Sequence, residues 1–430
     1  MKKEYFHNCL ELEKKISTNS ATYRMSRLIL FTLLFPIIGF GQGYQVNLQG
    51  QIQQGMGGAG TGLMHDASAL FFNPGGVSFV NRSEVSLGMS PTFASGTFTE
   101  DNTNASASTT SPMGTPFSAY GLFQIKDSSR LKLGLAIYTP FGSTVEWEEG
   151  WVGRFALTRL QLMAIFFQPT VSFRISDKIG IGAGFVYSYG KVNLQKDLPL
   201  QDQSGEYGSV ELDGTGRGFG YNVGLYYEPT DYLSVGVTYK SQVDMKITSG
   251  TATFDVPASL DDKFPSGAFT SSLPLPQVFT IGIGIKPGDK LSMALDVNFV
   301  GWKAYDTLAF DYETNTESLE DTKSARNYKN TIAIRIGGQY KFTPKVIARL
   351  GVAFGISPVQ DGYVTPETPD ANRINYTAGI GYKMNDKFQF DLSFLFTRVT
   401  REDTNLETGL SGNFETNVFA PGFSVTYNLY

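Results

Sequence analysis

From residue 83 onward, the chain consists of segments in which apolar residues alternate with polar or small ones. In residues 291–299 every second residue is apolar, from Leu291 to Phe299, and the same period recurs in residues 388–396. A β-strand turns successive side chains to opposite faces, so each such segment predicts a strand with one apolar face. The alternation itself fits both a soluble β-sandwich and a membrane-spanning barrel.

The lengths of the connections distinguish these two folds. Short turns rich in Pro, Gly, Asp and Asn, such as residues 287–289 and 343–344, alternate with long polar connections such as residues 100–116, 196–214 and 306–328. This asymmetry is typical of bacterial outer-membrane barrels, which have an even number of strands. We therefore expect an all-β fold, a transmembrane antiparallel β-barrel of about fourteen strands within residues 83–430. The expected strands cover residues 84–98, 117–126, 130–141, 160–175, 179–194, 215–228, 232–249, 276–286, 290–304, 329–342, 345–357, 373–383, 387–400 and 415–430.

The composition agrees with a membrane barrel. Charged residues make up 17% of the chain, against roughly 25% in an ordinary soluble protein. A helical membrane protein with so few charges would show runs of about 20 apolar residues. The longest apolar stretch, residues 28–40, is shorter than this and contains Pro36.

The first 41 residues have the pattern of a secretory signal peptide. Arg24 and Arg27 precede the apolar residues 28–35, and small residues follow up to Gly41. We expect cleavage near Gly41 and export from the cytoplasm. A methionine at position 25 makes residues 1–24 a candidate upstream extension of the start.

The remaining chain is acidic and poor in reactive side chains. The first 41 residues hold six Lys/Arg and three Asp/Glu, so the net charge of −5 becomes −5 − 3 = −8 after cleavage. This charge argues against a nucleic-acid partner. The single cysteine, Cys9, lies in the removed part, and His65 is the one histidine left. We expect no cofactor, no metal and no enzymatic activity. His65 as the base of a lipase would need an adjacent nucleophile, and no nucleophile motif accompanies it.

Residues 43–82 are rich in glycine and lack strand alternation. They contain Asp66 and the run Phe71-Phe72-Asn73-Pro74-Gly75, after the glycine-rich residues 57–60. This pattern resembles the FadL family of outer-membrane transporters for long-chain fatty acids and aromatic hydrocarbons, and the resemblance covers nearly all of the chain after the signal peptide. Residues 138–142, 151–155 and 369–382 share in the resemblance. The family usually has Ala where this chain has Gly75.

The resemblance implies a fourteen-stranded barrel with an N-terminal hatch, here residues 43–82, inside the lumen. It also implies a lateral exit through the barrel wall, beside Pro140-Phe141-Gly142 in the third strand. Pro140 removes an N–H from the strand ladder, and Gly142 permits a kink or bulge. We expect Asn73 and Pro74 to supply hydrogen bonds at that gap. The alternative is that Pro140 only ends the strand.

The expected function is passive uptake of hydrophobic compounds, such as long-chain fatty acids, across the outer membrane of a Gram-negative bacterium. The alternative is a general porin for small polar solutes, which should lack a plug. The expected partners are outer-membrane lipid, lipopolysaccharide and the barrel assembly machinery, which would read the terminal aromatic Tyr430, and the barrel is expected to be a monomer.

Six residues are candidates for substrate binding: Arg154, Lys191, Arg335, Arg349, Trp147 and Trp151. The strand phase turns Arg335 and Arg349 into the lumen, where a guanidinium could hold a carboxylate. The alternative that we favour for Arg335 is a structural pair with Asp296. Trp147 and Trp151 fit either a hydrophobic groove, together with Tyr138, or an aromatic girdle at the membrane interface.

Overall fold

The structure, a computed structural model, describes residues 43–126 and 129–429. The predicted signal peptide, most of the predicted turn at residues 127–129 and the terminal Tyr430 lie outside this part of the chain.

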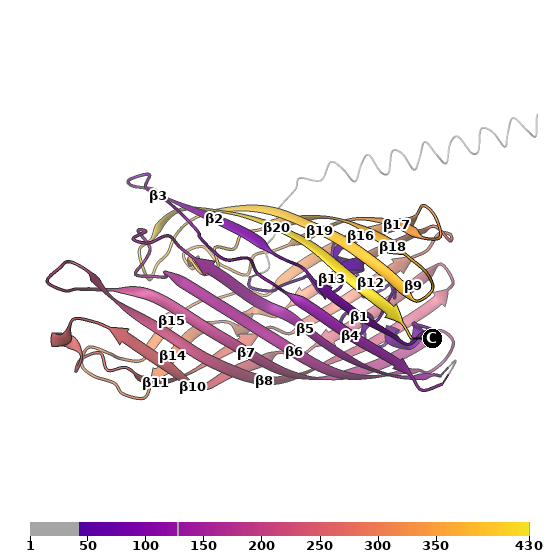
Figure 1. Cartoon of the computed structure of the whole chain (residues 1–430), viewed down its shortest axis with the longest axis horizontal. Helices are drawn as coiled ribbons and strands as arrows, with labels where there is room; N and C mark the ends of the chain where they lie inside the picture. The colour runs from indigo at the N-terminus through magenta and orange to yellow at the C-terminus, as the bar shows by residue number, and fades with distance from the viewer. Residues whose placement is uncertain (1–42, 127–128, 430) are drawn as a thin grey trace, which may run out of the picture. The chain divides into compact units, whose positions relative to one another are not determined.

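The strands form a closed antiparallel barrel with 14 strand positions, as the sequence predicts (Figure 1). The first position is divided into β1 (Glu84–Met89) and β2 (Phe93–Glu100). The last strand, β20 (Ser411–Asn428), pairs with β1 and so closes the barrel. Between them lie β4 (Phe117–Gln124), β5 (Leu131–Glu146), β6 (Arg159–Arg174), β7 (Ile179–Gln201), β8 (Tyr207–Thr230), β9 (Leu233–Lys240) with β10 (Val243–Asp255), β11 (Gly267–Leu275) with β12 (Val278–Ile285), β13 (Leu291–Val300), β16 (Thr331–Lys341), β17 (Val346–Gly355), β18 (Arg373–Lys383) and β19 (Phe388–Thr404).

Several shorter elements extend this frame. β3 (Ser106–Ser108) pairs with β2, and the hairpin of β14 (Thr307–Tyr312) and β15 (Thr322–Ala325) lies between β13 and β16. One 3₁₀ turn, η2 (Ala258–Leu260), lies between β10 and β11, and another, η3 (Trp302–Ala304), follows β13. No helix in the described part of the chain is long and apolar enough to span a membrane.

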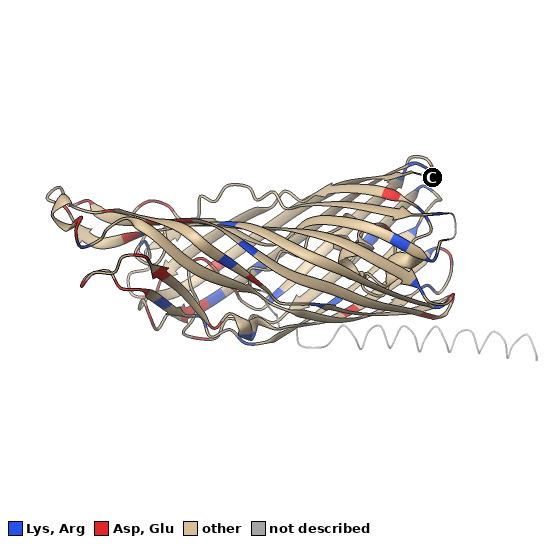
Figure 2. Cartoon of the chain, turned by 90° about the horizontal axis from the view of Figure 1, so that it is seen from below, with Lys and Arg blue, Asp and Glu red and all other residues tan. Residues whose placement is uncertain are grey.

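The two faces of the strands differ as the alternation predicts. On β19, Phe390 and Leu392 are exposed on the outer face, whereas Asp391 and Ser393, which alternate with them, are buried. Apolar side chains therefore face outward, which is the arrangement of a barrel in lipid and the reverse of a soluble sandwich. Figure 2 shows many of the Asp and Glu residues in the loops at the end opposite the C-terminus.

Several strands extend further than the alternation predicts. Residues 196–214 lengthen the β7–β8 hairpin, with its turn at residues 202–206, instead of forming a polar loop, and residues 306–328 contain β14 and β15. The third strand continues past residue 141 to Glu146. Apolar side chains also hold these extensions together, since Val210, Leu212 and Tyr312 belong to one buried cluster against which Leu198 and Phe310 pack.

Residues 43–82 pack against the inward face of the strands. They form the short helices α2 (Gln51–Gln54) and α3 (Ala69–Phe72) and the 3₁₀ turn η1 (Gly76–Phe79). α2 contacts β18, β19 and β20, whereas η1 contacts β5 to β8. The approach is close enough to require glycine in the wall. A Cβ atom on Gly337 would lie 2.2 Å from the Met56 carbonyl oxygen, and one on Gly351 would lie 2.1 Å from the Gly57 nitrogen.

Candidate functional site

The wall of the barrel is irregular at the predicted position in β5. The ladder between β4 and β5 ends at the pair Ser118–Tyr138, and pairing on that side resumes at the bridge Thr109–Trp147. Against β6, the register shifts between Tyr138 and Phe141, which is a β-bulge at Thr139 and Pro140. The strand does not end at Pro140, and the alternative that it stops there is wrong.

Residues 44–49 cover the edge of β5 that β4 leaves unpaired. The N–H of Val46 donates to the Pro140 carbonyl (2.9 Å), and the N–H of Gly142 donates to the Tyr44 carbonyl (3.3 Å). The Gln49 side-chain amide donates to the Thr139 carbonyl (3.0 Å). A short strand-like segment thus satisfies backbone groups that would otherwise be orphaned in the wall.

This finding corrects the expectation for Asn73 and Pro74. The Asn73 amide donates to the carbonyls of Thr61 (3.0 Å) and Leu225 (3.1 Å), the latter on β8. The Pro74 carbonyl oxygen packs so close to β7 that a Cβ atom on Gly182 would lie 2.2 Å from it. The motif therefore anchors residues 43–82 to β7 and β8, and in the described part of the chain it forms no hydrogen bond at the bulge.

A cavity of about 470 Å³ lies against this irregular part of the wall, and we call it the wall cavity. Pro116, Phe141 and Gly142 line it on the wall side, and residues 43–48 line it on the lumen side. Its far side is formed by inward-facing residues of β18, β19 and β20, including Arg373, Leu395 and Val418.

A second cavity of about 80 Å³ lies within the lumen, and we call it the apolar cavity. Its lining is mostly aliphatic, and comes from β5, β6, β7, β10 and β11: Leu160, Leu162, Val192, Leu194, Met245, Ile247, Leu273 and Leu275. Lys191 and Glu367 also line it.

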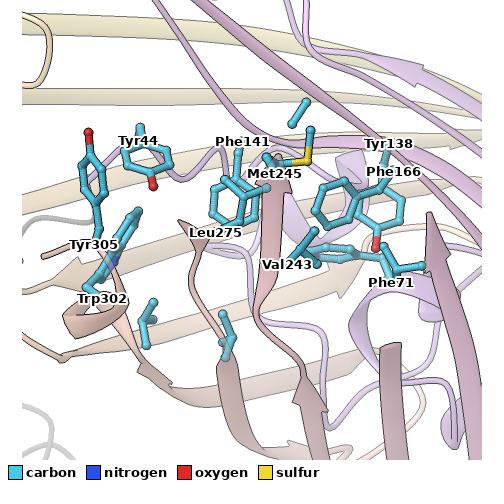
Figure 3. Packing of buried hydrophobic residues seen from close by; sticks show 14 of the residues in the cluster. Tyr44, Phe71, Tyr138, Phe141, Phe166, Val243, Met245, Leu275, Trp302 and Tyr305 are labelled. Carbon is cyan, nitrogen blue, oxygen red and sulfur yellow. The ribbon is translucent and has the colours of Figure 1, made fainter. Parts of the chain in front are cut away.

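Tyr44 and Phe141 line both cavities. Their ring centroids lie 6.1 Å apart, and Figure 3 shows the two rings side by side among buried aromatic and aliphatic residues. The Tyr44 hydroxyl donates to the Pro274 carbonyl on β11 (2.9 Å), and its ring packs edge-on against Trp302 (4.8 Å) and Tyr305 (5.5 Å). The two rings therefore lie between the wall cavity and the apolar cavity.

The charged side chains that the strand phase turns into the lumen are buried in the structure. Asp296 and Arg335 are register partners on β13 and β16, but each side chain binds residues 43–82 instead. Asp296 accepts the N–H groups of Gly60 and Thr61 (2.9 Å each), and Arg335 donates to the Gly58 carbonyl (3.3 Å). Two opposite charges of the wall thus hold one turn of residues 43–82.

Arg349 has a different partner. It forms an ion pair with Asp391 (2.7 Å), in which each side chain is 1% exposed, and also donates to Gln339 (3.2 Å). Both partners of Arg349, Asp391 and Gln339, are buried side chains of the protein, so the described part of the structure leaves no open position for a ligand carboxylate beside it.

The other binding candidates lie toward the long-loop end. Arg154 lies 3.6 Å from Asp197 and stacks over the rings of Phe155 and Tyr207. Lys191 lines the apolar cavity and lies 3.4 Å from Asp213, with both side chains about half exposed.

Trp147 and Trp151 stack on each other, with ring centroids 4.3 Å apart, and both are buried. The interpretation of these two residues as an aromatic girdle is therefore wrong. Trp147 lines the wall cavity, and Trp151 packs against Phe98 of β2.

The remaining members of the hatch motif are also buried. Phe71 and Phe72 pack edge to face (4.9 Å), and Phe71 contacts Tyr138 in the same way (4.9 Å). Asp66 hydrogen-bonds the Ser68 hydroxyl and backbone N–H. His65 lies beside Gln339 (3.5 Å), and burial, reinforced by the Arg349 charge, lowers its pKa to about 3.

Two residues of this region, Tyr44 and Asp370, are not among the predicted site residues, although Asp370 belongs to the residues 369–382 that share in the resemblance. Tyr44 lies just after the expected cleavage site, and Asp370 lies in the loop between β17 and β18. The N–H of Gly43 donates to the Asp370 carboxylate (2.7 Å), so this loop holds the start of the described chain. Burial raises the pKa of Asp370, while the nearby Arg373 charge acts in the opposite direction.

Comparison with known proteins gives one family. The family model described as outer membrane protein transport protein (OMPP1/FadL/TodX) matches residues 35–429. A putative outer membrane protein of Neisseria meningitidis serogroup B is 25% identical and covers 90% of this chain and 92% of its own. The long-chain fatty acid transport protein of Escherichia coli K12 is 20% identical, over 86% of this chain and 91% of its own.

Solved structures show the same fold. A Pseudomonas aeruginosa FadL homologue superposes with a TM-score of 0.79 at 18% identity, covering 90% of this chain and 100% of its own. The Pseudomonas putida toluene transporter TodX gives a TM-score of 0.72 at 17% identity, covering 89% of this chain and 98% of its own.

Proposed function

Because the chain belongs to the family of outer-membrane transport proteins (OMPP1/FadL/TodX), we propose that it takes up hydrophobic compounds by passive diffusion, with a lateral exit through the barrel wall at Thr139–Gly142. The long-loop end would face the cell exterior, as in other outer-membrane barrels. Substrate would enter the apolar cavity, pass Tyr44 and Phe141, and leave through the wall cavity toward the lipid.

The observation that carries this proposal is the wall at β5. There a bulge interrupts the continuous ladder of β5. Among the residues described, the edge of the bulge that faces β4 pairs its backbone only with residues 44–46. Those residues belong to a segment that is not part of the barrel, so their displacement would open the wall without breaking a barrel strand. Elsewhere, opening the wall would expose unpaired backbone to lipid at a cost of several kcal/mol.

The lining of the two cavities favours apolar cargo. Burial of an apolar chain stabilises it by about 0.8 kcal/mol per CH₂, so a hydrophobic molecule would have none of this stabilisation in a water-filled pore. The aliphatic lining of the apolar cavity offers the opposite environment. A general porin, in contrast, needs an open aqueous path, whereas here residues 43–82 pack against the inward face of strands around the barrel.

In the proposal, residues 43–82 are the hatch that blocks bulk water, and their short N-terminal stretch is the movable part. The partners would be a hydrophobic small molecule, outer-membrane lipid and lipopolysaccharide around a single barrel, and the assembly machinery during insertion. The family is made up of transport proteins, and the proposal assigns no catalytic step.

The test replaces Gly142 with Trp and measures the uptake of a labelled fatty acid and a labelled aromatic hydrocarbon by cells. Gly142 lines the wall cavity, and a Cβ atom there would lie 3.2 Å from the Leu162 carbonyl oxygen, a tight contact that a shift of a few tenths of an ångström would relieve, so that the Trp side chain can fill the cavity. We expect uptake of both compounds to fall at least tenfold. Gly288→Trp, at an open turn position with no atom within 4 Å of its Cβ, is the matched control.

Unchanged uptake in Gly142→Trp, with normal surface expression, would remove the lateral exit from the proposal. Loss of uptake in both variants would show that added bulk, rather than the position in the wall, is responsible.

A further inference from the structure

Most cations that face the lumen already have partners. Arg349 is paired with Asp391, Arg326 with Glu367 (2.7 Å), and Arg335 binds the Gly58 carbonyl and Asn47. These guanidinium groups hold the protein together, and a ligand could use them only by displacing a buried partner, which is costly.

Arg373 is different. It is the first residue of β18, and its strand phase turns it inward, into the wall cavity. The Nε atoms of Arg326, Arg335 and Arg373 are all buried without a partner, but only Arg373 also makes no hydrogen bond through its other side-chain nitrogens in the part of the chain that the structure describes. An unsatisfied buried donor on a charged group is destabilising, so this group needs an explanation.

The acidic side chain of Asp370 does not supply the missing hydrogen-bond partner of Arg373. Asp370 lines the same cavity, but its carboxylate accepts the Gly43 N–H (2.7 Å) and the Ser357 hydroxyl (3.1 Å). Both of these hydrogen bonds go to Oδ2 of Asp370, and its charge acts on Arg373 through space, with no hydrogen bond between the two side chains in the described part of the chain.

The surroundings of Arg373 are amphipathic. The side chain of Asn375 follows it on the inward face of β18, and the aliphatic side chains of Leu395, Val399 and Val418 line the neighbouring wall. At about 470 Å³, the cavity has the size of an ordinary small-ligand site. It thus combines a guanidinium that has no hydrogen-bond partner among the described residues with an apolar surface beside it.

We propose that Arg373 binds the anionic headgroup of a single-chain carboxylate amphiphile in the wall cavity, with the chain lying along the aliphatic residues of β19 and β20. A guanidinium presents a planar fork of donors that fits a carboxylate. This inference rests on the proposed function. It places the headgroup of an acid substrate at the wall, beside the exit, and not at Lys191 in the apolar cavity.

The experiment uses the full barrel purified in a non-ionic detergent, and two probes: a spin-labelled long-chain fatty acid and its methyl ester. Immobilisation of the label gives the Kd of each. The wild-type protein should bind the acid about tenfold more tightly than the ester, which corresponds to one charge-assisted contact. Arg373→Gln should abolish this preference and leave the ester affinity unchanged, whereas Arg373→Lys should retain part of it.

Lys191→Gln is the matched control, because Lys191 is the cation that lines the other cavity. Its acid preference should equal that of the wild type. If Lys191→Gln loses the preference, or Arg373→Gln keeps it, the headgroup does not bind Arg373 and the inference is overturned.

The two proposals fail in different ways. Tight binding of the ester, with no better binding of the acid by the wild type, would contradict the inference alone. Failure of the wild type to bind either probe would contradict the proposed function as well. Both results come from the wild-type protein, so they hold even if Arg373→Gln does not fold.

Discussion

Single glycines on the inward face decide how close residues 43–82 can approach the wall. Gly337 and Gly338 are adjacent on β16 but face opposite sides of the strand. A Cβ atom on Gly337 would collide with the Met56 carbonyl at 2.2 Å, whereas one on Gly338 meets nothing closer than 3.3 Å. Sequence alternation identifies both as small residues in a strand, but it cannot show which one touches another segment of backbone.

This pair gives a matched test at the residue scale. Gly337→Val should displace the turn at Met56 from β16, because a collision with backbone cannot be relieved by a side-chain rotation. We expect amide hydrogen exchange in residues 54–60 to become at least tenfold faster. Gly338→Val should leave that exchange as in the wild type, and equal protection in the two variants would show that the Met56 turn does not pack as described.

At the scale of elements, the strands could be predicted from the sequence, but the contacts of residues 43–82 could not. Apolar and polar residues alternate around Phe390 because one face of the strand is in lipid and the other faces a filled lumen. This alternation therefore identifies the strands and their phase. The same phase places Asp296 opposite Arg335. Their hydrogen bonds to Gly60 and Gly58 are beyond prediction from sequence, because they depend on where an irregular segment lies in space.

For the bulge in β5, too, one part could be predicted from the sequence and another could not. Pro140 and Gly142 in one strand predict an irregular ladder, and the register shift confirms it. The contact of residues 44–49 with that edge joins positions about a hundred residues apart through three hydrogen bonds, and no pattern in residues 43–49 indicates it.

The hatch assignment makes a prediction for the whole segment. Removal of residues 43–82 should leave a barrel that still assembles, because the ladders from β1 to β20 close without it. In a planar bilayer, the shortened protein should show a higher single-channel conductance than the intact one, since the polar inner face would then be hydrated. Equal conductance of the two inserted proteins would mean that residues 43–82 do not block the lumen.

At the scale of the whole molecule, the closed set of ladders determines how the protein behaves in detergent. Every wall strand is paired with a neighbour on both sides, although β5 pairs with β4 only up to Tyr138, and a closed barrel has no free edge strand at which unfolding can begin. We expect unboiled and boiled samples to migrate differently on a denaturing gel. Identical migration of protein that retains its β-sheet circular dichroism spectrum would contradict the closed barrel.

The most direct test of the lateral exit locks its cover in place. Gln45 and Phe141 form an antiparallel bridge flanked by the hydrogen bonds of Val46 and Gly142, and the chain after the predicted signal peptide contains no cysteine. The double variant Gln45→Cys/Phe141→Cys can therefore form one defined disulfide across this bridge. We predict that cells carrying the oxidised variant take up a labelled hydrophobic compound at least tenfold more slowly than the same cells after reduction, with single-cysteine variants insensitive to the oxidant. Equal uptake by the oxidised and reduced forms, with the disulfide verified by mass spectrometry, would contradict an exit that opens by release of residues 44–46 from β5.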